Sequence, residues 1–470
     1  MLKYLFNYVP AKVLPGLINL ASIMIYSRIF SQQDYGEFSY IVAIGALLQG
    51  IFFPWIRMSL SRFIHEYEES DEKRLFLNNI YNLHYFISIG ASVILVLLYF
   101  ITNNFYFLLI VMLISTSSTV ELVFANLRSE FLVRKFAAFS IIRSVFKLLL
   151  TVFFAYLMTN GTYSLIFGAV LTNVLIIISL RKFTPSLSFK KTLENREAIK
   201  QFLGYGLPLT FTFLMTIILS SIDRVFIRNY LGLNEVAEYT LAYDFSSFIT
   251  TNIIMIINLA YYPIIMRSYT KKLNYQIRLL EYNKLIFLFS SSLLIILITN
   301  SKFISQVVFG DQYNVSTMSY IVIIISISAF ISSLKSFYFD IVFHISKNTK
   351  LQIIPIVVAA LINIVLNWIF IPIFELKGAL YATLISYLIS LILSILIGRK
   401  ILKIPLLNRV GMASIFFITG LPLILNTVFE NENLYKLSFT IVIVLIIYVS
   451  LMFIMERKLI TRIIKGNILD

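Results

Sequence analysis

Cysteine is absent from this chain, and charged residues are scarce. None of the 470 residues is Cys, and Asp, Glu, Lys and Arg make up only 13% of them. The first absence excludes disulfides, thiol catalysis and Cys-ligated zinc. With only three histidines as well, we expect no metal site and no cofactor. The second absence sets the chain apart from soluble domains, in which about 25% of residues are charged.

Long apolar runs account for most of the sequence. Hydrophobic residues make up 59% of the chain, and the mean hydropathy is +0.87. Each run has about 20 residues, the length of helix that crosses a hydrocarbon core of about 30 Å. The sequence therefore predicts an all-α membrane protein with about fourteen transmembrane helices. The predicted spans are 9–29, 38–60, 80–101, 105–127, 138–158, 163–181, 203–228, 236–262, 282–301, 316–342, 351–372, 376–398, 408–428 and 436–455.

The distribution of positive charge along the chain indicates which loops lie in the cytoplasm. The net charge is +16, but no basic block stands apart from the spans, so we expect no nucleic-acid partner. If the N-terminus lies in the cytoplasm and successive loops alternate between the two sides of the membrane, 30 of the 39 Lys and Arg residues fall on the cytoplasmic side. Cytoplasmic loops of membrane proteins carry this excess. We therefore predict a multi-pass protein of the cytoplasmic (inner) membrane with both termini in the cytoplasm. The first apolar run lacks a small-residue cleavage site and is expected to remain as a span.

Two halves of the sequence resemble each other. The stretch 28–38 is similar to 228–239, and 164–169 is similar to 378–383. Each half holds six predicted spans, so both copies enter the membrane with the same orientation. Parallel repeats of this kind occur in transporters, with the substrate site between the halves; the alternative is chance similarity among apolar helices. The predicted domains are an N-terminal lobe at 1–182, a cytoplasmic linker at 183–202, a second six-helix lobe at 203–400, and two further helices with a tail at 401–470.

The repeated segments resemble a known family. The run 27–40, the triplet Ile222-Asp223-Arg224 and the segment 377–383 are similar to polysaccharide-biosynthesis flippases of the Wzx type. These flippases export repeat units of O-antigen or capsule. They belong to the multidrug/oligosaccharidyl-lipid/polysaccharide exporter superfamily.

The resemblance implies a transporter rather than an enzyme. Its cargo would be an undecaprenyl-diphosphate-linked oligosaccharide, moved from the cytoplasmic to the periplasmic leaflet by alternating access. The implied partners are the lipid bilayer, a polysaccharide polymerase and chain-length machinery. Export of a drug or of lipid II stays open within the same superfamily. A membrane polymerase or glycosyltransferase would need a sizeable outer loop to hold its reacting groups, and the sequence has none.

Four charged residues stand out within predicted spans. Arg143 and Lys147 are four residues apart, so they share one helix face, and Arg57 and Glu121 lie in two other spans. A charge at the bilayer centre costs at least about 2.5–3.5 kcal/mol, so it usually faces a partner or a wet cavity. We predict that these residues line a cavity in which cations meet the diphosphate. The alternatives are an internal pair of Glu121 with Arg143 or Lys147, and an Arg57 that reaches the inner interface.

A second charged group lies near the predicted outer face. It comprises Asp223, Arg224, Arg228, Asp244 and Arg28. One interpretation is an outer gate of ion pairs that break when the outer mouth opens. The other is static salt bridges and anchoring at the ends of the spans.

A third group lies toward the inner end of the span 316–342. Asp340 and His344 are four residues apart and could share a proton, and Lys335 lies one turn earlier. Ion coupling is one interpretation, and a capped helix end is the other. His65 and His84 are expected at the surface or the interface.

Three prolines lie within predicted spans. Pro15, Pro208 and Pro355 are expected to interrupt the first, seventh and eleventh of them. Bends at these positions would suit helices that move during alternating access.

Overall fold

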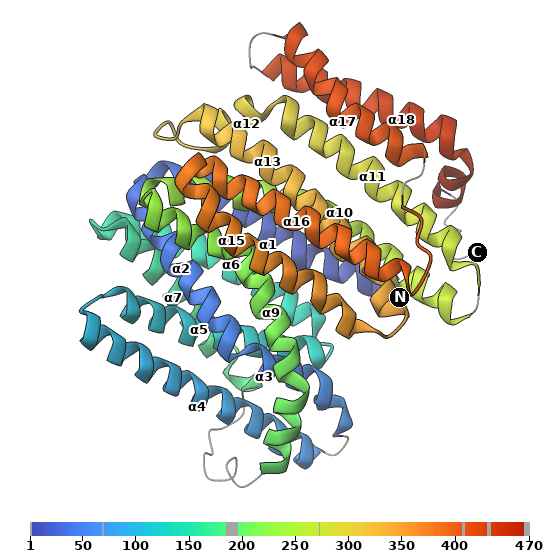
Figure 1. Cartoon of the computed structure of the whole chain (residues 1–470). Coiled ribbons are helices and arrows are strands. Elements are labelled where there is room, and N and C mark those ends of the chain that lie inside the picture. Colours follow the sequence, from blue (N-terminus) through green and yellow to red (C-terminus); the bar gives the residue numbers. More distant parts are fainter. Residues whose placement is uncertain are drawn as a thin grey trace. The chain divides into compact units, whose positions relative to one another are not determined.

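A computed structural model describes residues 2–67, 70–184, 196–271, 273–406, 409–429 and 434–464 (Figure 1). Every regular element within these ranges is helical, which confirms the predicted all-α class. Among the described residues, twelve helices are long and apolar enough to cross a membrane, and shorter apolar helices cover Val13–Ile29 and Leu434–Tyr448. Each of the fourteen predicted spans overlaps one of these segments.

The chain divides into two compact units, Met1–Ala237 and Glu238–Asp470. The predicted linker 183–202 lies largely outside the described residues, and the domain boundaries drawn there from the repeat stay a prediction.

The helices of the first unit are α1 (Leu2–Ile29), α2 (Gln32–Phe52), α3 (Pro54–Phe63), α4 (Ser70–Thr102), α5 (Tyr106–Ser129), α6 (Val133–Leu157), α7 (Gly161–Ser179) and α9 (Arg196–Tyr230), with 3-10 turns η1 (Ile64–Glu66) and η2 (Arg181–Phe183).

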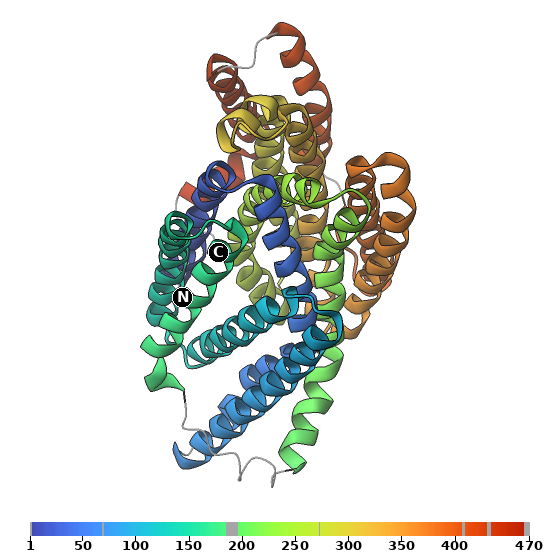
Figure 2. The same cartoon turned by 90° about the vertical axis from the view of Figure 1, so that its left-hand side faces the viewer.

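Tight turns with side-chain caps connect the helices of the first unit. Ser31 accepts a hydrogen bond from the backbone N–H of Asp34 and starts α2, and Asn160 does the same for Tyr163 at the start of α7. Such caps satisfy N–H groups that lack a partner within the helix. Helix α6 packs against α1 and α7, and α4 runs beside α5 (Figures 1 and 2). These connections hold the six N-terminal spans as neighbours.

The predicted span 38–60 is broken in two, which corrects the sequence-based expectation. Helix α2 ends before Pro54, and α3 begins at it, because proline has no N–H to continue the helix but fits its first position. Conversely, α1 continues through Pro15 and α9 through Pro208, so the predicted interruptions there are wrong. Pro355 lies in the first turn of α15 (Ile353–Phe374), where proline also fits. The break at Pro54 sets the direction of the short helix that carries Arg57.

A glycine on α9 lets α3 approach closely. A Cβ at Gly206 would lie 2.6–2.7 Å from the Cβ, Cα and carbonyl oxygen of Trp55, whereas one at Gly204 would meet no atom within 4 Å. The hydroxyl of Ser59 also donates to the carbonyl of Phe202 at 3.1 Å. Close backbone approach at small residues is a common way for membrane helices to associate. The position of α3, and so of Arg57, depends on this contact.

Gly206→Ala should destabilise the protein, whereas Gly204→Ala should not. The first change forces backbone atoms of α3 and α9 apart, and overpacking of this kind costs about 1–3 kcal/mol. The second adds a methyl group in open space and gains up to about 1 kcal/mol of helix propensity. Thermal unfolding of the two purified variants in detergent measures the difference. Equal melting temperatures would show that the contact between α3 and α9 does not contribute.

The second unit has a similar helical make-up. Its helices are α10 (Leu233–Thr270, which begins in the first unit), α11 (Tyr275–Thr299), α12 (Ser301–Val308), α13 (Val315–Ser333), the π-helix η3 (Leu334–Phe339), α14 (Ile341–Ile345), η4 (Thr349–Gln352), α15 (Ile353–Phe374), α16 (Leu376–Arg399), α17 (Arg409–Val428) and α18 (Leu434–Ile464). Helix α16 packs against α13 and α15. Helices α15 and α16 pack against each other, as α6 and α7 do in the first unit.

Helices α17 and α18 both pack against α11 (Figure 1). A cluster of buried apolar side chains joins the three helices: Leu288 and Ile295 of α11, Val410 of α17, and Val444 and Tyr448 of α18.

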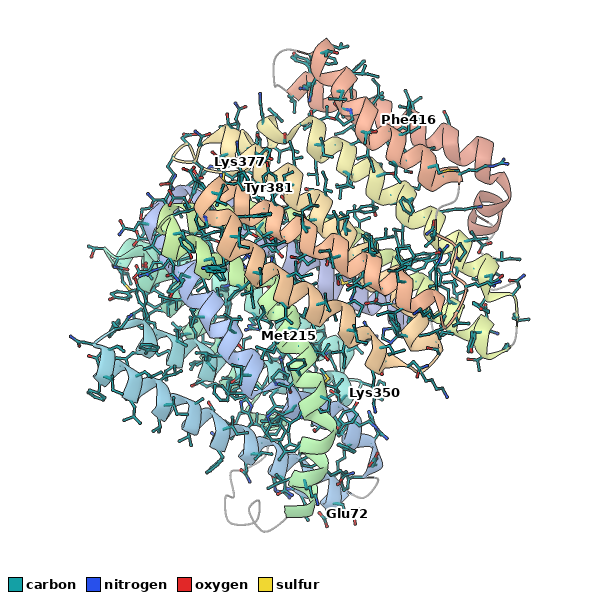
Figure 3. All side chains as sticks on the ribbon, viewed as in Figure 1. Glu72, Met215, Lys350, Lys377, Tyr381 and Phe416 are labelled. Atoms are coloured by element: carbon teal, nitrogen blue, oxygen red, sulfur yellow. The ribbon has the colours of Figure 1, made fainter. Side chains whose placement is uncertain are left out.

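The outward face of α17 carries large apolar side chains. Phe416 is 71% exposed on it (Figure 3). Exposed aromatics of this size suit a lipid-facing surface.

An aromatic contact joins α13 to the first turns of α16. Lys377 and Tyr381 lie one turn apart on α16 (Figure 3), and both contact Tyr320 of α13. The two tyrosine hydroxyls are 2.7 Å apart, and the Lys377 ammonium lies 5.5 Å from the Tyr320 ring centre. Tyrosines and lysines at helix ends are typical of membrane interfaces.

Candidate functional site

Three charged side chains from three helices meet within the first unit. Glu121 of α5 accepts from Arg57 of α3 at 3.5 Å through Oε2, and from Arg143 of α6 at 3.2 Å through Oε1. One carboxylate therefore bridges two guanidinium groups. We refer to Arg57, Glu121 and Arg143 as the charged triad.

Polar and aromatic neighbours orient Arg143. Its Nε donates to the side-chain Oδ1 of Asn173 on α7 at 3.0 Å, and Asn173 Nδ2 donates to the Thr116 hydroxyl at 3.4 Å. The guanidinium also lies 5.8 Å from the ring centre of Phe124. The sequence analysis did not predict that Asn173, Thr116 and Phe124 contact Arg143. The order of the helices in the chain does not show which residues of α5, α6 and α7 lie at the same level.

Two members of the triad lie inside candidate membrane spans, and all three side chains are partly exposed. Glu121 and Arg143 belong to the candidate spans Tyr106–Ser129 and Val133–Leu157. Arg143 is ten residues into α6, which is about 15 Å along the helix at 1.5 Å per residue. The exposed fractions of Arg57, Glu121 and Arg143 are 22%, 33% and 26%. A charge at such depth needs either a partner or water, and each guanidinium has Glu121 as its partner.

The triad has one more positive than negative charge. Two guanidinium groups share one carboxylate, and arginine stays protonated in proteins. Lys147 is one turn further along α6 and is partly buried, and its carbonyl oxygen accepts from the Tyr26 hydroxyl at 3.4 Å. The pairing of Glu121 with Arg143 that we considered as an alternative is present, and it leaves the cluster cationic. Arg57 joins the triad rather than pointing away from it.

One histidine is buried close to the triad. His84 of α4 is fully buried, its Nε2 lies 3.3 Å from the Thr119 hydroxyl and 3.4 Å from the Ser118 hydroxyl, and its ring packs on Phe53 at 4.9 Å. The expectation of a surface or interfacial position for His84 is therefore wrong. His84 lies within an apolar run of the sequence, and this position indicates burial. His65 is exposed, as predicted.

The residues of the predicted outer gate fall on several helices. Asp223 and Arg224 are buried on α9, and Arg224 donates to the carbonyl of Ser220 at 2.9 Å. Asp244 is partly buried on α10. The gate itself stays a prediction.

The two arginines at span ends make different contacts. Arg28 is exposed and donates to the Met24 carbonyl at 2.7 Å, one turn back on α1. The Arg228 guanidinium lies 5.2 Å from the ring centre of Tyr40. The Arg28 contact is local to its own helix, whereas the stacking of Arg228 joins α9 to α2.

The third predicted group forms a buried ion pair in the second unit. Lys335 Nζ lies 2.8 Å from Asp340 Oδ2, and the two side chains are 6% and 0% exposed. Gln352 donates to the same carboxylate at 3.1 Å, and Ser394 of α16 donates to its other oxygen. His344 is exposed, with its ring 6.2 Å from that of Tyr262. Lys335, rather than His344, is thus the ionic partner that Asp340 has in the structure.

The sequence profile of the family described as polysaccharide biosynthesis protein matches residues 3–269, more than half of the chain. The chain belongs to this family. A second profile, MatE, matches residues 208–369. The predicted membership in the multidrug/oligosaccharidyl-lipid/polysaccharide superfamily is thereby confirmed. This polysaccharide biosynthesis family member is a multi-pass membrane transporter rather than an enzyme.

Solved structures have the same fold as this family member. The inward closed conformation of the lipid II flippase MurJ aligns over 98% of this chain and 100% of its own, with a TM-score of 0.72 at 18% identity. An inward-facing multidrug resistance MATE transporter covers 82% of this chain and 94% of its own, with a TM-score of 0.60 at 15% identity.

One curated relative is also a membrane protein. The membrane protein MJ1068 of Methanocaldococcus jannaschii is 23% identical over 298 residues, which are 61% of this chain. The alignment spans 58% of that relative's length.

Proposed function

We propose that this protein is a flippase for an undecaprenyl-diphosphate-linked oligosaccharide. The cargo would enter from the cytoplasmic leaflet of the inner membrane and leave in the opposite leaflet by alternating access. Both chain termini would lie in the cytoplasm, in agreement with the distribution of Lys and Arg. Membership in the polysaccharide biosynthesis family supports a sugar cargo.

The cationic triad is the observation that carries the proposal. A lipid diphosphate brings about two negative charges into the membrane, where bare charges are costly. Arg57 and Arg143 offer planar forks suited to phosphate oxygens, and Lys147 adds a point charge one turn away. Glu121 holds the two guanidinium groups near each other while the site is empty, when their mutual repulsion would otherwise separate them.

Binding of the cargo would redistribute these contacts. Phosphate oxygens would take over guanidinium N–H groups that now face Glu121, and the 3.5 Å contact of Arg57 is the weaker of the two. The Nε of Arg143 is held by Asn173 at 3.0 Å, so that side chain is oriented before the cargo arrives. We therefore assign Arg143 as the fixed phosphate contact and Arg57 as the adaptable one.

The outer charged residues and the buried ion pair would serve the transport cycle. We assign Asp223, Arg224, Arg228, Asp244 and Arg28 to an outer gate, and Lys335 with Asp340 and His344 to coupling or to the stability of the second unit. A polymerase and chain-length machinery would take up the delivered cargo.

Lipid II is a second candidate cargo. The full-length likeness to the lipid II flippase MurJ favours it, and a lipid-linked diphosphate would meet the same cations. A cationic drug is less compatible with the triad, because the net positive charge would repel it.

Transport should depend on the diphosphate. In liposomes that contain the purified protein, a diphosphate-linked oligosaccharide should cross at least about tenfold faster than a neutral glycolipid of the same sugar. A charge-assisted hydrogen bond contributes about 1.5–3 kcal/mol, and 1.4 kcal/mol is tenfold. Accessibility of the sugar to an external lectin measures the rate.

Protein-free liposomes and liposomes with the Arg143→Gln variant are the controls. Equal rates for the charged and neutral lipids would contradict the proposal. Uptake of a cationic dye by the same liposomes, without movement of either lipid, would point to a drug exporter instead.

A further inference from the structure

A second cationic site lies at one end of the second unit, far along the chain from the triad. A cavity of about 530 Å³ is lined by Gln276, Arg399, Lys403, Ile404 and Pro405. We name it the interfacial pocket. Its lining combines two cations, one amide and two apolar side chains.

The pocket lies where lipid phosphates would be. Arg399 is the last residue of the candidate span Leu376–Arg399, and Gln276 is the second residue of Tyr275–Thr299. The ends of spans are at the level of the headgroups. Basic pockets between transmembrane helices at this level bind acidic headgroups.

The connection that follows α16 has a defined shape. The Tyr338 hydroxyl of the π-helix donates to the carbonyl of Pro405 at 2.8 Å, and Ile404 is 7% exposed. Ile401 and Leu402 donate to the carbonyl of Gly398 at 3.0 Å each. These bonds satisfy the carbonyl of Gly398 at the C-terminal end of α16, where unpaired carbonyl groups would repel an anion. Both Arg399 and Lys403 line the cavity.

The two chain segments that line the pocket carry no acidic side chain. The segments 275–280 and 399–406 contain no Asp or Glu. Glu281, the first carboxylate of α11, is paired with Arg278 at 3.1 Å. Arg399 and Lys403 are both exposed, so an anion can reach them. The pocket therefore carries two positive charges from its own side chains.

We propose that the interfacial pocket binds a phosphate-bearing anion between Arg399 and Lys403. The Arg399 fork takes two phosphate oxygens, Lys403 supplies a second charge, and the Gln276 amide donates to a neighbouring oxygen. Ile404 and Pro405 supply an apolar edge, which fits a phospholipid headgroup with the start of its acyl chains better than free phosphate. This site is separate from the triad and requires no transport of its ligand.

Binding of phosphatidylglycerol to the full-length protein in detergent tests the proposal. Titration followed by native mass spectrometry gives the dissociation constant of the tightest lipid. The double variant Arg399→Gln/Lys403→Gln should weaken it roughly 25-fold, about fivefold for each cation near a lipid phosphate. Lys403→Gln alone provides the same test with a single change, should the double variant be poorly expressed.

A matched control removes two charges from the same connection outside the pocket. Lys400→Gln/Arg409→Gln changes two exposed cations that do not line it, and it should leave the dissociation constant unchanged. Equal weakening by both double variants, or unaltered binding in Arg399→Gln/Lys403→Gln, would overturn the proposal.

Two further ligands identify the source of the phosphate. Inorganic phosphate that displaces phosphatidylglycerol at low millimolar concentration would support the phosphate site and point to a soluble ligand. Displacement by phosphatidic acid alone would support a lipid headgroup. Tight binding of phosphatidylcholine at the same site would overturn the requirement for an anion.

Discussion

Arg143→Ala/Lys147→Ala should abolish export of the lipid-linked sugar while the protein remains in the membrane. The variant loses two positive charges from one face of α6 and leaves Glu121 with Arg57 as its remaining triad partner. Loss of two phosphate contacts at about 1.5–3 kcal/mol each predicts at least a hundredfold lower rate. Lectin accessibility in the liposome assay measures the rate, and membrane yield measures folding.

The control for this variant is Arg62→Ala/Lys135→Ala. It also removes one arginine and one lysine, but from helix ends, where Arg62 is exposed and pairs with Glu66 at 2.8 Å. It should retain a rate close to that of the unchanged protein. If it loses as much activity as Arg143→Ala/Lys147→Ala, the loss reflects total charge rather than the triad.

The variant Arg143→Ala/Glu121→Ala separates cargo binding from internal pairing. If Arg143 serves only to neutralise Glu121, removing both should restore transport. If it contacts the diphosphate, transport should stay low. Recovery to the unchanged rate would therefore contradict the role we propose for Arg143.

Lys335→Met should strongly destabilise the protein. It leaves the Asp340 carboxylate, which is 0% exposed, without its ionic partner, and breaking a buried pair from one side costs about 3–5 kcal/mol. Gln352 and Ser394 would still contact the carboxylate but bring no charge. Thermal unfolding in detergent, read as the folded fraction by size-exclusion chromatography, measures the effect.

Lys73→Met is the matched control for the buried pair. Lys73 lies 2.7 Å from Glu130, but these side chains are 30% and 28% exposed, and such pairs contribute about 0–1 kcal/mol. The double variant Lys335→Met/Asp340→Asn should lose less stability than Lys335→Met, because no bare charge remains. Equal melting temperatures for Lys335→Met and Lys73→Met would contradict a buried pair.

The buried pair also explains a local irregularity of the fold. Lys335 lies in the π-helix Leu334–Phe339, and the backbone N–H of Asp340 donates to the carbonyl of Lys335 at 2.9 Å. This wider turn brings a lysine and an aspartate five residues apart into contact. π-Turns within α-helices occur often at functional sites. A regular α-helical repeat, which the sequence pattern suggested over 316–342, would not pair them in this way.

The spans and the class of the protein followed from the sequence because lipid imposes a strong local rule. A helix that crosses the bilayer must be apolar over about 20 residues, and each predicted span matches a helix segment. The Lys and Arg pattern predicted the orientation, and the segments 27–40 and 377–383 indicated the superfamily that the profile matches support. These signals lie within single segments and need no knowledge of packing.

The contacts among the charged residues could be decided only by the tertiary structure. Arg143 and Glu121 are 22 residues apart and Arg57 and Glu121 are 64 apart, so no local pattern shows that one carboxylate bridges both. The close approach of α3 to α9 at Gly206 likewise depends on which helices pack together. The hydrocarbon core of the bilayer requires only that the helices be apolar, so many helix arrangements are compatible with one hydropathy profile. The packing of small and polar side chains between helices selects among those arrangements.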